Sequence, residues 1–231
     1  MKTKQLQRVG IGLGIVLLFL GCDPELEADL YVQDILDVVE TGNILEIPVR
    51  LGMPIASTDD CEEDKNKMLP ALERYGIGTK FISCKSLDDQ MYDLLEVEMN
   101  AQIVVQSDKS STIVFKGMFG VLLSEVDDGS INVRVVKTDN VEKAMSQIGE
   151  NYPFQDTTLS GFNIRVYLRN DLRTPVRYEV DNSFVDNNPV DEPTVFELDR
   201  RGVIEIVPSN VRALSILKNG SAKFGRLFKG W

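Results

Sequence analysis

The 231-residue chain contains no histidine. Histidine is the commonest general base and the commonest metal-binding side chain in proteins. Hydrolases of the Ser-His or Cys-His type are therefore excluded. The motifs G-x-S-x-G, the P-loop and G-x-G-x-x-G in a suitable context are also missing. The sequence predicts a protein that is not an enzyme and that uses no metal and no cofactor.

Basic residues are also few. Lys and Arg number 25 against 36 Asp and Glu, which gives a formal net charge of -11. Nucleic-acid binding needs basic surface that displaces counterions, so we expect no nucleic-acid partner. The chain is 43% hydrophobic and 26% charged, which is typical of a folded globular protein.

The first 21 residues have the pattern of an export signal. Residues 1–8, MKTKQLQR, are basic and polar, and residues 9–21 carry no charge. A helix over this uncharged stretch would reach only about 20 Å, short of the roughly 30 Å hydrocarbon core of a bilayer. We therefore interpret residues 1–21 as a signal peptide rather than a permanent membrane span.

The end of this segment, Leu18-Phe19-Leu20-Gly21-Cys22, resembles the lipobox of bacterial lipoproteins. In that pattern a large apolar residue, a variable small residue and Gly or Ala precede an obligatory cysteine. Phe19 stands where leucine is usual, and Leu20 stands where a smaller residue is usual. The resemblance implies that Cys22 is the lipidated first residue of the mature protein. The alternative is an ordinary signal peptide that ends near a cysteine.

The resemblance also implies how the protein is held and where. One acyl chain binds a membrane only marginally, so the two or three chains of a lipoprotein make a lasting anchor. The acidic residues 22–30 are expected to form a tether that anionic head groups repel. In enterobacterial lipoproteins an aspartate after the lipidated cysteine commonly retains the protein in the inner membrane. We interpret Asp23 as such a sorting residue. It favours the inner membrane over the outer membrane, with the protein facing the periplasm.

Two further cysteines, Cys61 and Cys84, are available for pairing. An exported protein meets an oxidising compartment, so we expect a structural disulfide between them. The alternative is a redox or metal pair. It is disfavoured because the two residues form no C-x-x-C motif and have no histidine beside them.

Residues 31–150 are predicted to form an α+β domain with a mostly antiparallel sheet. Pro48 should place its strand at a sheet edge, and Pro70 should kink or split its helix. The expected helices cover residues 32–41, 57–76 and 140–148, and the expected strands cover residues 45–53, 79–85, 94–105, 111–126 and 130–137.

Residues 157–231 are predicted to form a separate β-sandwich of the immunoglobulin-like kind. The polar segment 149–161 is predicted to be the linker, and Asn219-Gly220 is predicted to be a hairpin turn. The hallmark Cys and Trp of a true immunoglobulin domain are missing, so the likeness concerns architecture only. The six expected strands cover residues 162–168, 175–181, 194–198, 203–207, 211–217 and 221–228.

Three segments are candidates for binding. The carboxylates between Asp59 and Asp64 are acceptable Ca²⁺ ligands, but they lack EF-hand spacing and are interpreted as a solvated helix start. A second cation candidate is the loop with Asp186, Asn187, Asn188, Asp191 and Glu192; the alternative is an ordinary solvated loop. The basic, aromatic segment 212–231 could contact an anionic membrane or an acidic partner, or be a final strand with a charged face.

These observations lead to a functional hypothesis with two alternatives. We expect a lipid-anchored envelope protein that acts by protein–protein binding or assembly. One alternative is an accessory lipoprotein of phage or plasmid type that blocks an envelope receptor. The other is a His-free glycan hydrolase, which would need two carboxylates about 5 to 10 Å apart in a cleft with aromatic walls.

Overall fold

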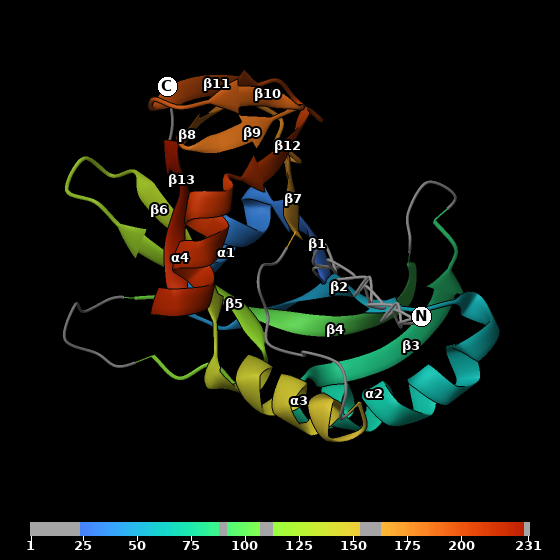
Figure 1. Ribbon diagram of the computed structural model, residues 1–231. Coiled ribbons are helices and arrows are strands. Elements are labelled where there is room, and N and C mark those ends of the chain that lie inside the picture. Colours follow the sequence, from blue (N-terminus) through green and yellow to red (C-terminus); the bar gives the residue numbers. More distant parts are fainter. Residues whose placement is uncertain (1–23, 88–91, 107–112, 153–162, 229–231) are drawn as a thin grey trace, which may run out of the picture.

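The computed structural model describes residues 24–87, 92–106, 113–152 and 163–228 (Figure 1). The predicted signal peptide, Cys22 and Asp23 lie outside the described residues. The described chain forms one 13-stranded sheet and four α-helices. The strands are β1 (Glu25–Tyr31), β2 (Leu45–Ile55), β3 (Ile77–Lys85), β4 (Asp93–Val105), β5 (Phe119–Glu125), β6 (Ile131–Lys137), β7 (Asn163–Arg169), β8 (Val176–Val180), β9 (Ser183–Val185), β10 (Asn188–Val190), β11 (Thr194–Leu198), β12 (Val203–Pro208) and β13 (Ser221–Phe228).

The predicted acidic tether is wrong for residues 25–30, which form most of strand β1. This strand pairs with β2 on one side and with β7 on the other. Leu26 and Leu30 are buried, while Glu27 and Asp29 lie near arginines of the neighbouring strands. Asp29 accepts a hydrogen bond from Arg169 Nε at 2.5 Å, and Glu27 lies opposite Arg165. The carboxylate of Asp29 therefore forms a cross-strand ion pair inside the sheet.

Strand β2 is not the edge strand that Pro48 predicted. It pairs with β4 along its whole length and with β1 over Val49–Gly52. Pro48 lies just outside this doubly paired stretch, where its missing N–H leaves no strand partner unsatisfied.

The three expected helices of the first half are present. Helix α1 (Val32–Thr41) ends at Gly42, whose φ of 70° closes the helix. Helix α2 (Cys61–Tyr75) runs unbroken through Pro70, because this residue lies on the exposed side where water can reach the freed carbonyl group. Helix α3 (Asp139–Glu150) is capped by Thr138, which accepts from the N–H of Asn140. Helices α2 and α3 lie side by side beneath β3 (Figure 1).

The second half contains a helix where a strand was expected. Residues 211–217 belong to helix α4 (Asn210–Asn219), which is capped by Ser209 and packs on β13, β6 and β12. Gly220, with φ of 74°, ends this helix, so Asn219-Gly220 is not a hairpin turn. Strands β7, β8, β11, β12 and β13 confirm the other five expected strands.

The two halves share one sheet and one hydrophobic core. The strand order is β10-β9-β12-β7-β1-β2-β4-β5-β6-β13-β8-β11, with β3 attached to β4. Strand β7 therefore pairs with β1, and β13 pairs with β6, across the predicted boundary. The structure shows a mostly β protein with a few helices; it does not show a separate immunoglobulin-like domain.

The buried side chain of Asn170 links the chain after β7 to the end of β11, the last strand in this order. Its Nδ2 donates to the carbonyl oxygens of Leu198 at 2.8 Å, Asp199 at 3.1 Å and Thr174 at 2.9 Å. Its own N–H donates to the carbonyl oxygen of Gly202 at 2.9 Å. Asn170 directly follows β7, and Leu198 ends β11. This side chain therefore connects two strands that are far apart in the strand order.

Candidate functional site

The end of the sheet beside the predicted lipidation site is the first candidate. Pro24 is buried, and its carbonyl oxygen accepts a hydrogen bond from the N–H of Asn163 at 2.9 Å. Glu25 then begins β1. We call the strand ends gathered here the amino-terminal end of the sheet; they are marked by Glu25, Ile55, Lys85, Asp93 and Asn163.

A row of paired residues crosses four strands at this end. Glu25 lies opposite Gly52, Gly52 lies opposite Glu96, and Glu96 lies opposite Ser83. Ser83 Oγ donates to Glu96 Oε2 at 2.9 Å. Neighbouring strands are about 4.8 Å apart, so the row places β3 about 15 Å from Glu25.

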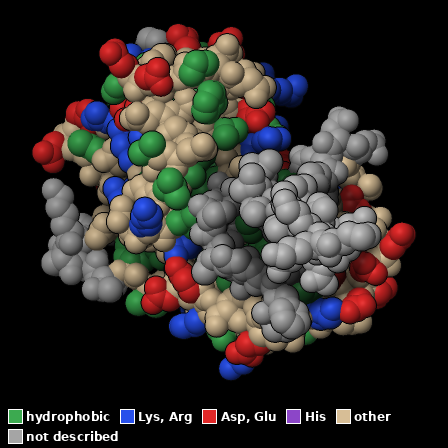
Figure 2. Space-filling view, viewed as in Figure 1, with side chains coloured by type: hydrophobic (Ala, Val, Ile, Leu, Met, Phe, Trp, Pro, Cys, Tyr) green, Lys and Arg blue, Asp and Glu red, His purple; other side chains and the backbone are tan. Residues whose placement is uncertain are grey.

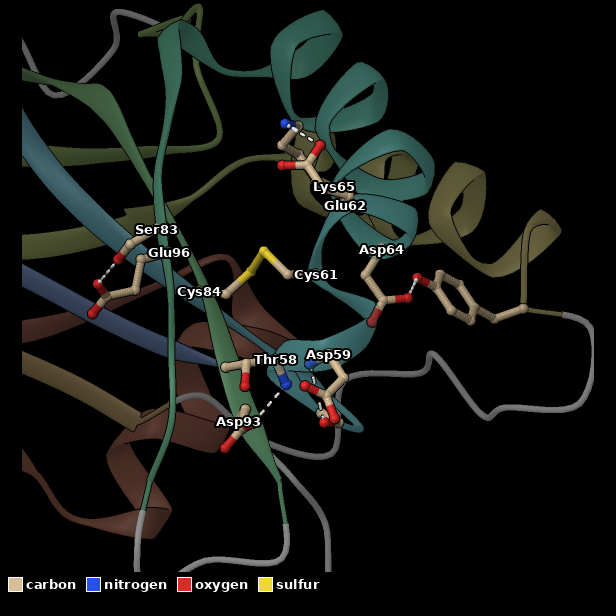
Figure 3. The surroundings of a disulfide bond; sticks show 12 residues. Thr58, Asp59, Cys61, Glu62, Asp64, Lys65, Ser83, Cys84, Asp93 and Glu96 are labelled. Carbon is tan, nitrogen blue, oxygen red and sulfur yellow. Dashed lines mark hydrogen bonds and ion pairs between the residues drawn. A yellow bond between two sulfur atoms is a disulfide. The ribbon is translucent and has the colours of Figure 1, made fainter.

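The predicted disulfide is confirmed and belongs to this end. Cys61 and Cys84 are bonded, with their Cα atoms 6.1 Å apart (Figure 3). Cys61 is the first residue of α2, and Cys84 is next to Ser83 in β3. The bond therefore fixes the start of α2 to the sheet.

Asp93 holds the two chain segments on either side of the disulfide. Its carboxylate accepts the N–H of Thr58 at 2.7 Å (Figure 3). It also accepts the N–H of Leu87 at 3.1 Å. These backbone hydrogen bonds lower the pKa of Asp93 below its usual value. The carboxylate thus connects the turn before α2 with the chain after β3.

The acidic cluster at the start of α2 does not converge on one point. Glu62 pairs with Lys65 at 2.6 Å, and Glu63 pairs with Lys67 at 2.5 Å. Figure 2 shows acidic side chains gathered along the edge of the molecule that α2 forms in Figure 1. Their place at the helix start suits the positive end of the helix dipole.

One member of the cluster is buried. Asp64 accepts a hydrogen bond from the hydroxyl group of Tyr152, which follows α3 (Figure 3). Burial and the nearby Asp64 carboxylate raise the pKa of Tyr152. Asn151 Nδ2 also donates to the carbonyl oxygen of Lys67 at 2.9 Å, so the end of α3 is attached to α2.

The second cation candidate, residues 186–192, contains a tight hairpin instead of an open loop. Asp186 and Asn187 have φ values of 47° and 65° and form the turn between β9 and β10. Asp186 Oδ1 accepts the N–H of Glu205 at 3.0 Å. Across the described residues, no group of three or more Asp, Glu, Cys or His side chains could hold a metal ion.

The basic side chains of the carboxyl-terminal segment are largely paired within the fold. Arg212 contacts Asp181, Lys223 Nζ lies 3.1 Å from Glu179 Oε1, and Arg226 contacts Asp128. Lys229 and Trp231 lie outside the described residues. Up to Phe228, the segment is thus a helix and a strand held by ion pairs.

The hydrolase alternative would need paired carboxylates in a cleft. The pKa of Asp34, near the start of α1, is raised by burial and by the carboxylates of Asp171 and Asp37. Neither of two cavities in the described chain adjoins Asp34. One, of about 30 Å³, lies among apolar side chains inside the curved sheet, and the other, of about 420 Å³, lies beside the β5–β6 turn.

A family model described as a domain of unknown function (DUF7424) matches residues 24–228. The match begins at Pro24, where the hydrogen-bonded sheet begins, and ends at the last residue of β13. No curated protein and no solved structure matches the sequence. Within the described residues, every helix is too short or too polar to cross a membrane.

Proposed function

The chain belongs to the DUF7424 family, and we propose that it is a bacterial lipoprotein that acts by binding other envelope proteins. In this proposal the acyl chains on Cys22 hold the protein in the membrane, and the folded body faces the periplasm. Catalysis has no part in the proposed role. Asp23 supports retention in the inner membrane.

The observation that carries the proposal is the sequence Leu18-Phe19-Leu20-Gly21-Cys22 after an uncharged segment. The Cys61–Cys84 disulfide supports export as well, since such bonds persist in oxidising compartments such as the periplasm.

A binding role is supported by apolar side chains left exposed on the carboxyl-terminal half. Val211 is 80% exposed and Leu214 is 39% exposed, one helical turn apart on α4. Phe184 on β9 and Val195 on β11 are also exposed. Val211 and Leu214 are close enough on the helix to form one apolar patch, and such patches are common where proteins contact one another.

Fatty-acid labelling tests the anchor. Cells that express the full chain with radiolabelled palmitate should yield a labelled protein, and Cys22→Ser should abolish the label and leave the precursor uncleaved. Cys61→Ser is the matched control, because it removes a cysteine from the folded body and should keep the label. Equal labelling of the wild type and Cys22→Ser would refute the proposal.

Cross-linking in intact cells separates two forms of the binding role. Several partners from one envelope machine would support assembly. A single channel or receptor would instead support the alternative, an accessory lipoprotein that blocks an envelope receptor.

A further inference from the structure

The distance between the proposed anchor and the sheet is very short. Pro24, two residues after Cys22, is buried and hydrogen-bonded to Asn163. Two residues span at most about 7 Å. The nine-residue acidic tether expected from the sequence would have spanned about 30 Å.

From this spacing we infer that the amino-terminal end of the sheet is seated on the lipid head groups in a fixed orientation. The inference rests on the proposed lipidation of Cys22. With the acyl chains in the bilayer, Glu25 and Asn163 cannot lie more than about 15 Å from the membrane surface. The disulfide between Cys61 and Cys84 belongs to the same end and faces the head groups with it.

The opposite end of the sheet then points away from the membrane. Strand β4 runs from the amino-terminal end to Val105, which pairs with Leu123, and β5 continues in the same direction to Glu125. Counted from Glu96, this path is about eleven residues, or about 35 Å along the strands. The turn that contains Asp127 follows directly, between β5 and β6.

The acidic start of α2 makes the choice of lipid matter. Its exposed carboxylates, Asp59, Asp60, Glu62 and Glu63, lie beside the disulfide at the seated end. An anionic bilayer would repel them, so neutral phosphatidylcholine vesicles give the direct test of seating.

Site-directed labelling tests the orientation in the full, lipidated chain. A fluorophore is attached to Asn163→Cys or to Asp127→Cys, both exposed, in vesicles whose head groups carry a nitroxide quencher. We expect several-fold stronger quenching at position 163 than at position 127. Equal quenching at both positions, or stronger quenching at 127, would overturn the inference.

A linker variant supplies the matched control. Inserting a Gly-Ser segment of about ten residues between Asp23 and Pro24 adds a mean reach of about 17 Å. It should keep flotation with the vesicles and lower quenching at position 163 towards that at 127; unchanged quenching would also contradict the inference. Loss of flotation in the unmodified chain would instead refute the lipid anchor, so the two failures can be distinguished.

Discussion

The backbone of Gly225 in β13 lies directly against the ring of Tyr178 in the neighbouring strand β8. A Cβ atom at position 225 would stand 2.2 Å from Cε1 of Tyr178, far inside contact distance. The register of β13 shifts between Lys223 and Gly225, which brings the glycine over the ring. Tyr178 is fully buried, and its hydroxyl group has no hydrogen-bond partner among the described residues.

Gly225→Ala should therefore lower the free energy of unfolding by about 2 kcal/mol or more, because the new methyl group overlaps a ring that cannot move. Denaturant unfolding measures this change. Tyr178→Phe is the control: it removes only an unpartnered buried hydroxyl and should leave stability unchanged or raise it. A Gly225→Ala protein as stable as the wild type would show that the ring has room to shift.

Breaking the disulfide should destabilise the protein. The bond closes a loop with a sequence separation of 23 residues. In the chain-entropy model such a closure is worth about 3 kcal/mol. We expect the Cys61→Ala, Cys84→Ala double variant to lose stability of this order in urea unfolding. An unchanged midpoint would mean that the bond does not restrict the unfolded chain.

Asn170→Ala should be costly because it leaves the buried carbonyl oxygen of Leu198 without the Nδ2 donor of Asn170. The expected loss is about 2 to 3 kcal/mol in the free energy of unfolding. Asn170→Asp, which keeps the size and the acceptor but loses the donor, should be destabilising as well. If Asn170→Asp matched the wild type, the Nδ2 hydrogen bonds would not matter for stability.

Local patterns predicted most of the single elements. Cap and stop residues set the bounds of α1 and α3, and alternating apolar residues marked β4. The same rules could have found two features that were missed. Residues 25–31, ELEADLY, alternate in period two, and Ser209 and Gly220 bracket α4 with a cap and a stop.

The pairing of the strands was not accessible in the same way. Nothing local to Glu27 or Asp29 indicates that Arg165 and Arg169, well over a hundred residues later, lie in the next strand. These carboxylates were therefore predicted to be solvent-exposed charges of a tether, because their partner residues are distant in the sequence. The edge-strand prediction from Pro48 was wrong for a similar reason. A proline is excluded only from the part of a strand that is paired on both sides, and the length over which β1 pairs with β2 is a tertiary property.

The candidate site shows the same limit. The disulfide could be predicted because only two cysteines remained after Cys22, so elimination sufficed. The closeness of Pro24 to the sheet could not be predicted, because it depends on the hydrogen bond from Asn163. The sequence left the segment at Asp186 open between a cation site and an ordinary solvated loop, because the positive φ values that make it a hairpin are a backbone property.

Acid should weaken the contact between Asp128 and β13. Hydrogen bonds from the Ser130 hydroxyl and backbone, then from Arg226, lower the pKa of Asp128 to about 2 from its usual 3.8. Because the folded-state pKa is depressed, the contribution of Asp128 to stability is present above about pH 4 and is lost as the pH falls towards 2. Asp128→Asn should thus be less stable than the wild type at pH 7, and the two should converge near pH 2. The exposed neighbour variant Asp127→Asn should track the wild type throughout; a constant gap for Asp128→Asn would contradict the assignment.

The carboxyl-terminal half should fail to fold by itself. Residues 157–231 contain β7 and β13, but their partners β1 and β6 lie in the other half. Cutting the chain there leaves both strands with an unpaired edge and exposes Ile164, Val166 and Phe224, which are buried in the shared core. Circular dichroism of this fragment should show no cooperative thermal transition, whereas residues 24–231 should unfold in one step. A cooperative transition with a strand signal in the fragment would show that its internal pairings, β7 with β12 and β8 with β11 and β13, are enough to hold a separate domain.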